Sequence, residues 1–364
     1  MSPKKQNTKN TNSTPKNQNT KSTQSPKKSI LRILLSIVTV IAVVAAAVLL
    51  GAVLYFRLPV SAYYAHSTAG FAIPDIHRGF IPQGLALDTG SDCFFITGYM
   101  KDKSASPVYM VDRTTERCVK KLLMQDTDGS DFHGHAGGIT VHGDHIYVTG
   151  GGKSCLYVFN YIDAIKATDG ERIKCIGTFP MPDDMSVAYT ASDEDVIYAG
   201  EFYREANYPT DESHKLTTAA GDYNQALIFA YHFSDDDDAL FGIEREPFEV
   251  YSVTDLVQGM DTYNGQIYLS TSYSVDFSHI FVYDKPHSTK ELDIAGMTLP
   301  LYELDRSVLV KDCKFPPMSE EIVCAGGRIY TMCESASDKY IFGKLTGAAK
   351  CYSTDIDAYI GDQK

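Results

Sequence analysis

The chain has 364 residues, with 33 basic and 46 acidic side chains, eight cysteines, 24 tyrosines and no tryptophan. This length fits one large domain or two small ones. The first 32 residues carry eight positive charges and no negative one, so the rest of the chain carries −21 against −13 overall. Such an acidic body repels phosphate backbones, which excludes nucleic acid as the expected partner. The absence of Trp excludes the repeat families defined by that residue.

The N-terminal region divides into a basic tail and an apolar run. Residues 1–29 are almost entirely Lys, Asn, Thr, Ser, Gln and Pro, which cannot bury enough apolar surface to offset the entropy of ordering. We predict that this tail is disordered. From Ile33 to Phe56 the chain runs for 24 residues without a charge. Because such a run can cross a hydrocarbon core of about 30 Å, we predict a transmembrane helix over residues 30–57.

A cleaved signal peptide is the alternative interpretation of the apolar run. Signal peptides have apolar regions of about 7–15 residues that end in small residues. The run here is longer, and Tyr55, Phe56 and Arg57 form a poor cleavage site. We therefore expect an uncleaved signal anchor in the cell membrane. By the positive-inside rule, the basic tail lies in the cytoplasm and the body lies outside, in a single-pass topology.

All eight cysteines follow the predicted anchor, at positions 93, 118, 155, 175, 313, 324, 333 and 351. An oxidising compartment would let them pair, so we expect disulfide bonds, although their spacing does not choose among the pairings. Ordinary buried thiols are the alternative. The chain has no Cys-x-x-Cys or Cys/His spacing typical of a structural zinc site.

One two-strand pattern occurs five times after residue 81. In each copy a small or polar residue leads into an alternating apolar strand, and a turn rich in Gly, Asp or Asn precedes a second strand with a fixed aromatic residue. The leading positions are Gly84, Gly138, Ser186, Gly259 and Glu321, and the aromatic residues are Phe95, Tyr147, Tyr198, Tyr268 and Tyr330. Third strands are expected over residues 108–112, 156–161, 227–233, 280–284 and 340–345. Fourth strands are expected over residues 118–124, 173–179, 248–253, 307–313 and near Cys351.

Four antiparallel strands that recur about five times predict an all-β fold, a β-propeller over residues 81–364. A β-sandwich does not explain five copies of one motif. Five four-stranded blades fit the pattern best, and six fit if residues 60–81 pair with the C-terminal strands beyond closing the ring. Residues 58–80 are predicted to be a juxtamembrane linker with a strand able to close that ring.

The motifs PQGLAL at Pro82, VQGMDT at Val257, HAGGI at His135 and TSYS at Thr271 carry a family resemblance. They resemble a group of bacterial membrane-anchored or exported β-propeller proteins and, more loosely, the YncE, strictosidine-synthase and paraoxonase-like propellers. The resemblance covers roughly residues 80–340. Because its motifs are structural, it implies a propeller fold and says little about chemistry.

The first strand of every propeller blade lines the central axis, so residues at the leading ends of the five copies are expected to converge in a funnel. Carboxylates, amides, a histidine and tyrosine hydroxyls gathered in a funnel form the expected ligand site. The predicted ligand-binding residues are Gln83, Tyr99, His135, Glu201, Tyr203, Gln258, Asp261, Tyr273, Glu321 and Glu334. The alternative is structural, since an amide such as that of Gln83 can bond neighbouring strands. Residues 204–225 are long enough to form a lid.

Asp183, Asp184 and Glu320 are the predicted metal ligands, and calcium, which takes six to eight oxygens, is the ion they would hold. Merely solvated carboxylates are the alternative. No hydrolase elbow, zinc-protease, Walker or dinucleotide motif is present. We therefore expect a protein that binds an extracellular small molecule, glycan or protein without chemistry of its own.

Two other functions stay open. One is a calcium-assisted hydrolase of a lactone, ester or glycoside, in which Glu320 holds the metal and His135 acts as base. The other is a scaffold in an envelope complex.

Overall fold

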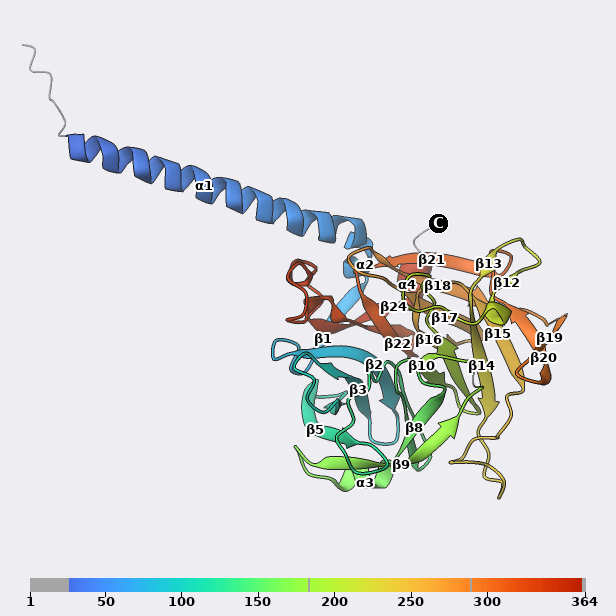
Figure 1. Ribbon diagram of the computed structural model, residues 1–364. Coiled ribbons are helices and arrows are strands. Elements are labelled where there is room, and N and C mark those ends of the chain that lie inside the picture. The colour runs from blue at the N-terminus through green and yellow to red at the C-terminus, as the bar shows by residue number, and fades with distance from the viewer. Residues whose placement is uncertain (1–25, 183, 289, 362–364) are drawn as a thin grey trace, which may run out of the picture. The chain divides into compact units, whose positions relative to one another are not determined.

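The computed structural model describes residues 26–182, 184–288 and 290–361, in two compact units that divide after Gly51 (Figure 1). Helix α1 spans Pro26–Arg57 and is long and apolar enough to cross a membrane, as predicted. It begins four residues before the predicted start, with proline in its first turn, where a missing N–H costs no hydrogen bond. The predicted disorder of the tail concerns residues 1–25, which lie outside the described residues.

Antiparallel pairing groups most strands of the second unit into successive meanders of four. The first is β2 (Phe80–Asp88), β3 (Cys93–Met100), β4 (Pro107–Asp112) and β5 (Arg117–Gln125). The second is β6 (Ile139–His142), β7 (His145–Thr149), β8 (Cys155–Asn160) and β9 (Arg172–Pro180). The third is β10 (Val187–Ser192), β11 (Val196–Glu201), β14 (Ala226–His232) and β15 (Glu249–Val253). The fourth is β16 (Val257–Tyr263), β17 (Gln266–Thr271), β18 (Ser278–Asp284) and β21 (Leu309–Phe315).

The last meander is completed by the first strand of the chain. It contains β22 (Ser319–Ala325), β23 (Arg328–Cys333) and β24 (Lys350–Asp355), and β24 pairs antiparallel with β1 (Ser67–Ala72). The register places Ser67 opposite Thr354. The two ends of the strand array are therefore hydrogen-bonded to each other.

The innermost strands β2, β6, β10, β16 and β22 lie against one another in a closed ring. Glycines allow their backbones to approach this closely. A Cβ added to Gly138 would lie 2.4 Å from the backbone nitrogen of Thr190, and one added to Gly259 would lie 2.6 Å from Cα of Glu321. The repeated leading glycines thus serve the close packing of the ring, and the fold is a β-propeller.

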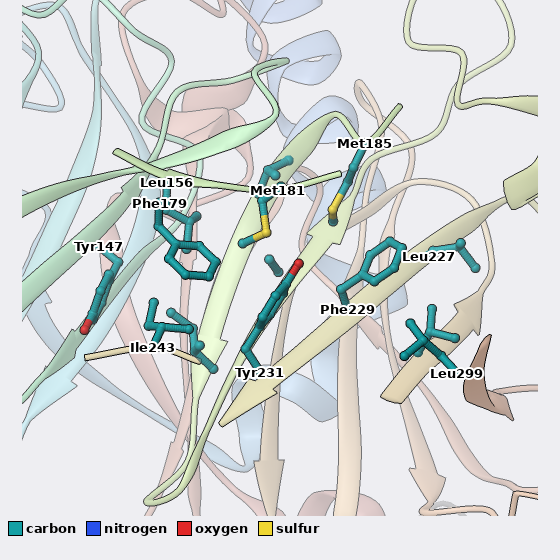
Figure 2. Close-up of a cluster of buried hydrophobic side chains, with 14 of the residues drawn as sticks. Tyr147, Leu156, Phe179, Met181, Met185, Leu227, Phe229, Tyr231, Ile243 and Leu299 are labelled. Atoms are coloured by element: carbon teal, nitrogen blue, oxygen red, sulfur yellow. The ribbon is translucent and has the colours of Figure 1, made fainter. Parts of the chain in front are cut away.

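Five buried apolar clusters fill the spaces between consecutive meanders. Figure 2 shows the cluster between the second and third meanders, where Phe179 of β9, Tyr231 of β14 and the intervening Met181 and Met185 lie together. The rings of Phe179 and Tyr231 meet edge to face with centroids 5.3 Å apart. Alternate strand residues supply these side chains, as expected for strands packed on both faces.

Short helices and two extra hairpins lie outside the four-stranded meanders. The helices are α2 (Ser61–Ala65), α3 (Tyr161–Lys166), α4 (Ile356–Gly361), η1 (Leu58–Val60), η2 (Glu212–His214), η3 (Glu334–Ala336) and η4 (Gly343–Leu345). The hairpins are β12 (Leu216–Thr217) with β13 (Tyr223–Asn224), and β19 (Lys290–Ile294) with β20 (Met297–Glu303). Hairpin β19–β20 extends the third meander through parallel pairing of β20 with β15.

The predicted third strand over residues 340–345 is wrong. These residues form a loop that ends in η4, and β24 takes the third position of its meander. The neighbouring apolar residues Ile341 and Phe342 are both exposed, whereas a packed strand buries alternate residues. The loop also brings Gly343 against the carbonyl oxygen of Ser335, where any side chain would clash.

The expected disulfide bonds are absent, since all eight cysteines are free thiols. Cys93 and Cys118 lie on β3 and β5 with β4 between them. Cys155 and Cys175, and Cys333 and Cys351, lie on neighbouring strands as unbonded thiols, and Cys155 faces Pro180 in the register. The even count and the position after the anchor therefore do not imply pairing.

Candidate functional site

A β-bulge interrupts four of the five innermost strands at the same end. The register shifts between Pro82 and Leu85 on β2 and between Ser319 and Ile322 on β22. Equivalent shifts occur at Val187–Tyr189 on β10 and Val257–Gly259 on β16. A bulge re-aims the side chains around it. The predicted residues Gln83, Gln258, Glu320 and Glu321 all lie within these bulges.

A carboxylate at the end of β23 forms the centre of the polar site. Gln83 donates a hydrogen bond from Nε2 to Glu334 Oε2 at 3.1 Å, and the Tyr340 hydroxyl donates to Glu334 Oε1 at 2.5 Å. Burial raises the pKa of Glu334 above its usual value, although these two donors and the nearby Lys339 cation oppose the rise. The fold thus joins the first and last meanders at this carboxylate.

A second carboxylate next to it has no partner. Glu320 is 2% exposed, and its carboxylate makes no hydrogen bond or ion pair with a described residue, although its oxygens, unlike those of Glu321, are not fully enclosed. Burial and the negative charge of Glu334 raise the pKa of Glu320 well above its usual value. Buried carboxylates are normally hydrogen-bonded or paired, so Glu320 is a site in need of a proton or a cation.

Two tyrosines and a lysine border the carboxylates. The Lys339 ammonium lies 5.0 Å from the ring centroid of Tyr99 and 4.9 Å from that of Tyr340, and it donates a hydrogen bond to the Tyr99 hydroxyl. The His135 ring lies 4.5 Å from the Tyr99 ring. Although the His135 side chain is exposed, desolvation by the surrounding wall and the Lys339 cation lower its pKa to about 4.

We call this group the funnel site, and it consists of Gln83, Tyr99, His135, Glu320, Glu334, Lys339 and Tyr340. An open pocket of about 230 Å³ adjoins it, between Tyr99 and His135. The funnel site combines two carboxyl groups with two aromatic rings and one internal ammonium group. Such an arrangement stabilises positive charge by ion pairing and by cation–π attraction.

Glu201 belongs to a separate, buried network under the loop over residues 204–225. His214 Nδ1 lies 2.9 Å from Glu201 Oε2, and His214 Nε2 lies 3.6 Å from Asp184 Oδ2. Glu201 also accepts the backbone N–H groups of Ser186 and Leu227. Burial alone would lower the pKa of His214, but the carboxylates around it raise the pKa above its usual value.

The remaining predicted tyrosines each hold a cation of the 204–225 loop. The Arg204 guanidinium carbon lies 3.9 Å from the ring centroid of Tyr273, and the Lys215 ammonium lies 5.3 Å from that of Tyr203. Tyr203 is buried, while Tyr273 is exposed. Gln258 is half-buried in its bulge.

Asp261 and Glu321 line a cavity of about 250 Å³ together with residues from all five innermost strands. We call it the axial cavity. Burial raises the pKa of Asp261 to about 7 and that of Glu321 well above its usual value. Both Glu321 oxygens are buried without a hydrogen-bond partner among the described residues. The predicted ligand-binding residues are therefore divided between the funnel site, the loop network and the axial cavity.

The predicted metal ligands do not form a cluster in the described part of the chain. Asp184 faces His214, and Glu320 faces Glu334 and Lys339. Asp183 lies outside the described residues. No group of three or more His, Cys, Asp or Glu side chains in residues 26–182, 184–288 and 290–361 is arranged to hold a metal ion. Since the predicted set includes Asp183, calcium binding by it stays a prediction.

Comparison with known proteins identifies neither a family nor a curated relative, since none matches the sequence. Solved propeller-type structures are similar to it. Glutaminyl cyclase of Myxococcus xanthus shares 12% identity and a TM-score of 0.41 over 80% of this chain and 94% of that chain. The exo-β-1,3-galactanase of Phanerochaete chrysosporium with galactose shares 12% identity and a TM-score of 0.41 over 79% of this chain and 63% of that chain.

The PQQ-bound aldose sugar dehydrogenase of Streptomyces coelicolor shares 14% identity and a TM-score of 0.38 over 73% of this chain and 76% of that chain. Similarity at this level carries no inference about function. The propeller assignment rests on the strand pairing described above. The specific propeller groups named from the sequence motifs stay a prediction.

Sequence reasoning missed Lys339, Tyr340 and His214. Lys339 and Tyr340 lie on a loop and His214 lies in the short helix η2, whereas the prediction took residues only from strand ends. One signal was present for His214, because it lies in the long segment predicted as a lid. The wrong prediction of a strand over residues 340–345 is the reason that Tyr340, and Lys339 directly before it, were not predicted as site residues.

Proposed function

We propose that this chain is a membrane-anchored, five-bladed propeller that binds a small extracellular ligand through an ammonium or guanidinium group. Each four-stranded meander is one blade, and β1 closes the ring. The basic tail lies in the cytoplasm and the propeller lies outside. The funnel site binds the ligand without chemistry of its own.

The unpartnered carboxylate of Glu320 carries the proposal. A carboxylate that is 2% exposed and has no bonding partner among the described residues is costly when ionised. A bound cation removes this cost, and Glu334 supplies a second negative oxygen pair beside it. A neutral or anionic ligand would leave the Glu320 carboxylate uncompensated.

The position of Lys339 supports the proposal of a cationic ligand. Its ammonium group lies against the rings of Tyr99 and Tyr340, and it is close enough to Glu320 and Glu334 to lower the pKa of both. Because Lys339 is an exposed residue on a loop, it can swing away. A ligand cation then takes its place between the rings and the carboxylates.

Calorimetric titration of the full chain in lipid nanodiscs tests the proposal. The probes are glycine amide, which carries an ammonium group, agmatine, which carries an ammonium and a guanidinium group, and N-acetylglycine amide, which is neutral. We expect the charged probes to bind, the neutral one not to bind, and Glu320→Gln to weaken binding at least tenfold. Glu205→Gln, at an exposed carboxylate, is the matched control. Equal binding of all three probes, or no effect of Glu320→Gln, would contradict the proposal.

One observation favours a second function. Glu320 and Glu334 are neighbouring carboxyl groups in unlike surroundings, because only Glu334 accepts side-chain hydrogen bonds. Unlike surroundings are what an acid–base pair that hydrolyses an ester, lactone or glycoside requires. His135, neutral at physiological pH, lies beside Tyr99 and is available as a base. Hydrolysis of a chromogenic ester or glycoside that Glu320→Gln and Glu334→Gln both abolish would favour this function over binding alone.

A further inference from the structure

We propose that an apolar patch at the edge of the propeller inserts into the lipid bilayer that anchors the chain. This rim patch consists of Tyr55, Val275, Ile341 and Phe342. The inference rests on the proposed function in one respect, because it requires α1 to span a membrane. It adds that the propeller itself binds the lipid surface.

The rim patch consists of large apolar side chains that are exposed, whereas side chains of this kind are usually buried in a soluble domain. Ile341 is 85% exposed and Phe342 is 63% exposed, more than any other large apolar residue described after Leu58. Val275, on the loop between β17 and β18, is 46% exposed. Exposed apolar side chains that gather in one place mark a surface that contacts a protein or a membrane.

The position of the rim patch selects the membrane. Phe56, near the end of α1, lines an apolar pocket of about 240 Å³ together with Val275, Ile341 and Phe342. The ring of Tyr55, 64% exposed, lies 6.2 Å from that of Phe277 on the same loop as Val275. The patch is therefore continuous with the interfacial end of the apolar helix, where aromatic residues of membrane proteins meet the headgroups.

The connection between helix end and propeller is short and packed. Val60 and Tyr63, in η1 and α2, are buried, and the Tyr63 ring lies 4.6 Å from that of Phe315 on β21. Tyr64 donates a hydrogen bond to the carbonyl oxygen of Thr346, near the Phe342 loop. The segment after α1 is thus fixed to the propeller, and only a short stretch of chain separates the patch from the apolar run.

Basic side chains flank the rim patch although the body is strongly acidic. Lys339 and Lys344 lie on the same loop as Ile341 and Phe342, and Lys314 lies 5.4 Å from the ring centroid of Phe277. Lys344 also pairs with Asp338 at 2.9 Å. Lysines around inserted apolar side chains are attracted to anionic lipid headgroups. Because the patch is continuous with the end of the apolar helix, the bilayer is the favoured occupant.

A tryptophan probe tests the inference, because the native chain has none and each introduced Trp can be excited selectively beside the 24 tyrosines. The full chain is reconstituted in lipid vesicles made with plain lipids or with lipids brominated on their acyl chains. The probe is Phe342→Trp, and Ile341→Trp replaces it if that variant loses the native thermal transition. Tyr223→Trp, at a residue of β13 that is 56% exposed, is the matched control. Tyr55→Trp reports the anchor.

We expect brominated lipids to quench Phe342→Trp and Tyr55→Trp at least twofold and to leave Tyr223→Trp unchanged. Quenching of Tyr55→Trp without quenching of Phe342→Trp would overturn the inference while membrane anchoring stands. A blue-shifted but unquenched Phe342→Trp would also overturn it, because protein rather than lipid would then cover the patch. If neither residue is quenched, the anchoring fails and the inference falls with it.

Discussion

The Gln83 side chain on β2 donates a hydrogen bond to the Glu334 carboxylate after β23, with 3.1 Å between Nε2 and Oε2. It connects the first innermost strand of the propeller to the last meander, where β1 also closes the strand array. Ring closure and the funnel site therefore share one contact. A change at this contact should therefore affect stability and, under the proposed function, ligand binding.

Replacing Gln83 with Ala should destabilise the protein by about 1–2 kcal/mol, because it removes a donor from a carboxylate in a buried site. Chemical denaturation at pH 7 measures this change in the free energy of unfolding. Gln258→Ala is the matched control, since Gln258 lies in the equivalent bulge of β16 and has no side-chain hydrogen bond recorded within the described residues. Equal destabilisation by the two variants would show that the Gln83–Glu334 hydrogen bond contributes nothing measurable to the free energy of unfolding.

Replacing Glu321 with Gln should stabilise the protein at pH 8 by about 1–3 kcal/mol and have little effect near pH 5. The raised pKa means that the native state binds a proton more tightly than the unfolded state. Stability is therefore lost as the pH rises from the usual glutamate value of 4.5 through the raised native value. Thermal unfolding of both proteins from pH 5 to 8 tests this. Glu194→Gln, at an exposed residue, should leave the profile unchanged.

Replacing His214 with Ala should destabilise the protein by about 3–5 kcal/mol at pH 6, because it leaves the Glu201 carboxylate buried without its counter-charge. Since the folded-state pKa of His214 is raised, the pair contributes fully below the free histidine value of 6.5. Its contribution is lost as the pH rises through the native value. The difference in unfolding free energy between variant and native protein should shrink between pH 6 and pH 9, and a constant difference would contradict the assignment.

Replacing Lys339 with Ala should strengthen binding of glycine amide about tenfold, because it removes the internal cation that competes for the tyrosine rings and carboxylates. The same calorimetric titration measures the effect. Lys344→Ala removes a nearby lysine that pairs with Asp338 instead, and should change the affinity less than twofold. Weaker binding by Lys339→Ala would show that Lys339 contacts the ligand directly instead of occupying the position of the ligand's cationic group.

Most of the strand pattern could be predicted because alternation and turn residues are local signals. The leading glycines Gly84 and Gly259 and the five fixed aromatic residues all lie in strands that the sequence predicts. The prediction of a strand from Tyr340 to Leu345 is wrong because its apolar residues Ile341 and Phe342 are exposed, whereas the alternating pattern assumes that apolar residues are buried. Membrane contact, as proposed above, would account for this exposure.

The candidate site was only partly accessible to sequence reasoning. Convergence of Gln83, Glu320 and Glu334 follows from propeller geometry, but the bulges that separate Glu320 from Glu321 have no local signal. The same is true of contacts made by loops, such as that of His214 with Glu201. Cysteine count and location predicted disulfides, yet pairing depends on which strands are neighbours.

Photoaffinity labelling tests the central claim most directly. An agmatine derivative with a diazirine is irradiated with the full chain in nanodiscs, and the labelled peptides are mapped by mass spectrometry. The account predicts labels on residues 334–340 and around Tyr99, competed by unlabelled agmatine and lost in Glu320→Gln. Labels confined to other surfaces, or a pattern that Glu320→Gln leaves unchanged, would contradict ligand binding at the funnel site.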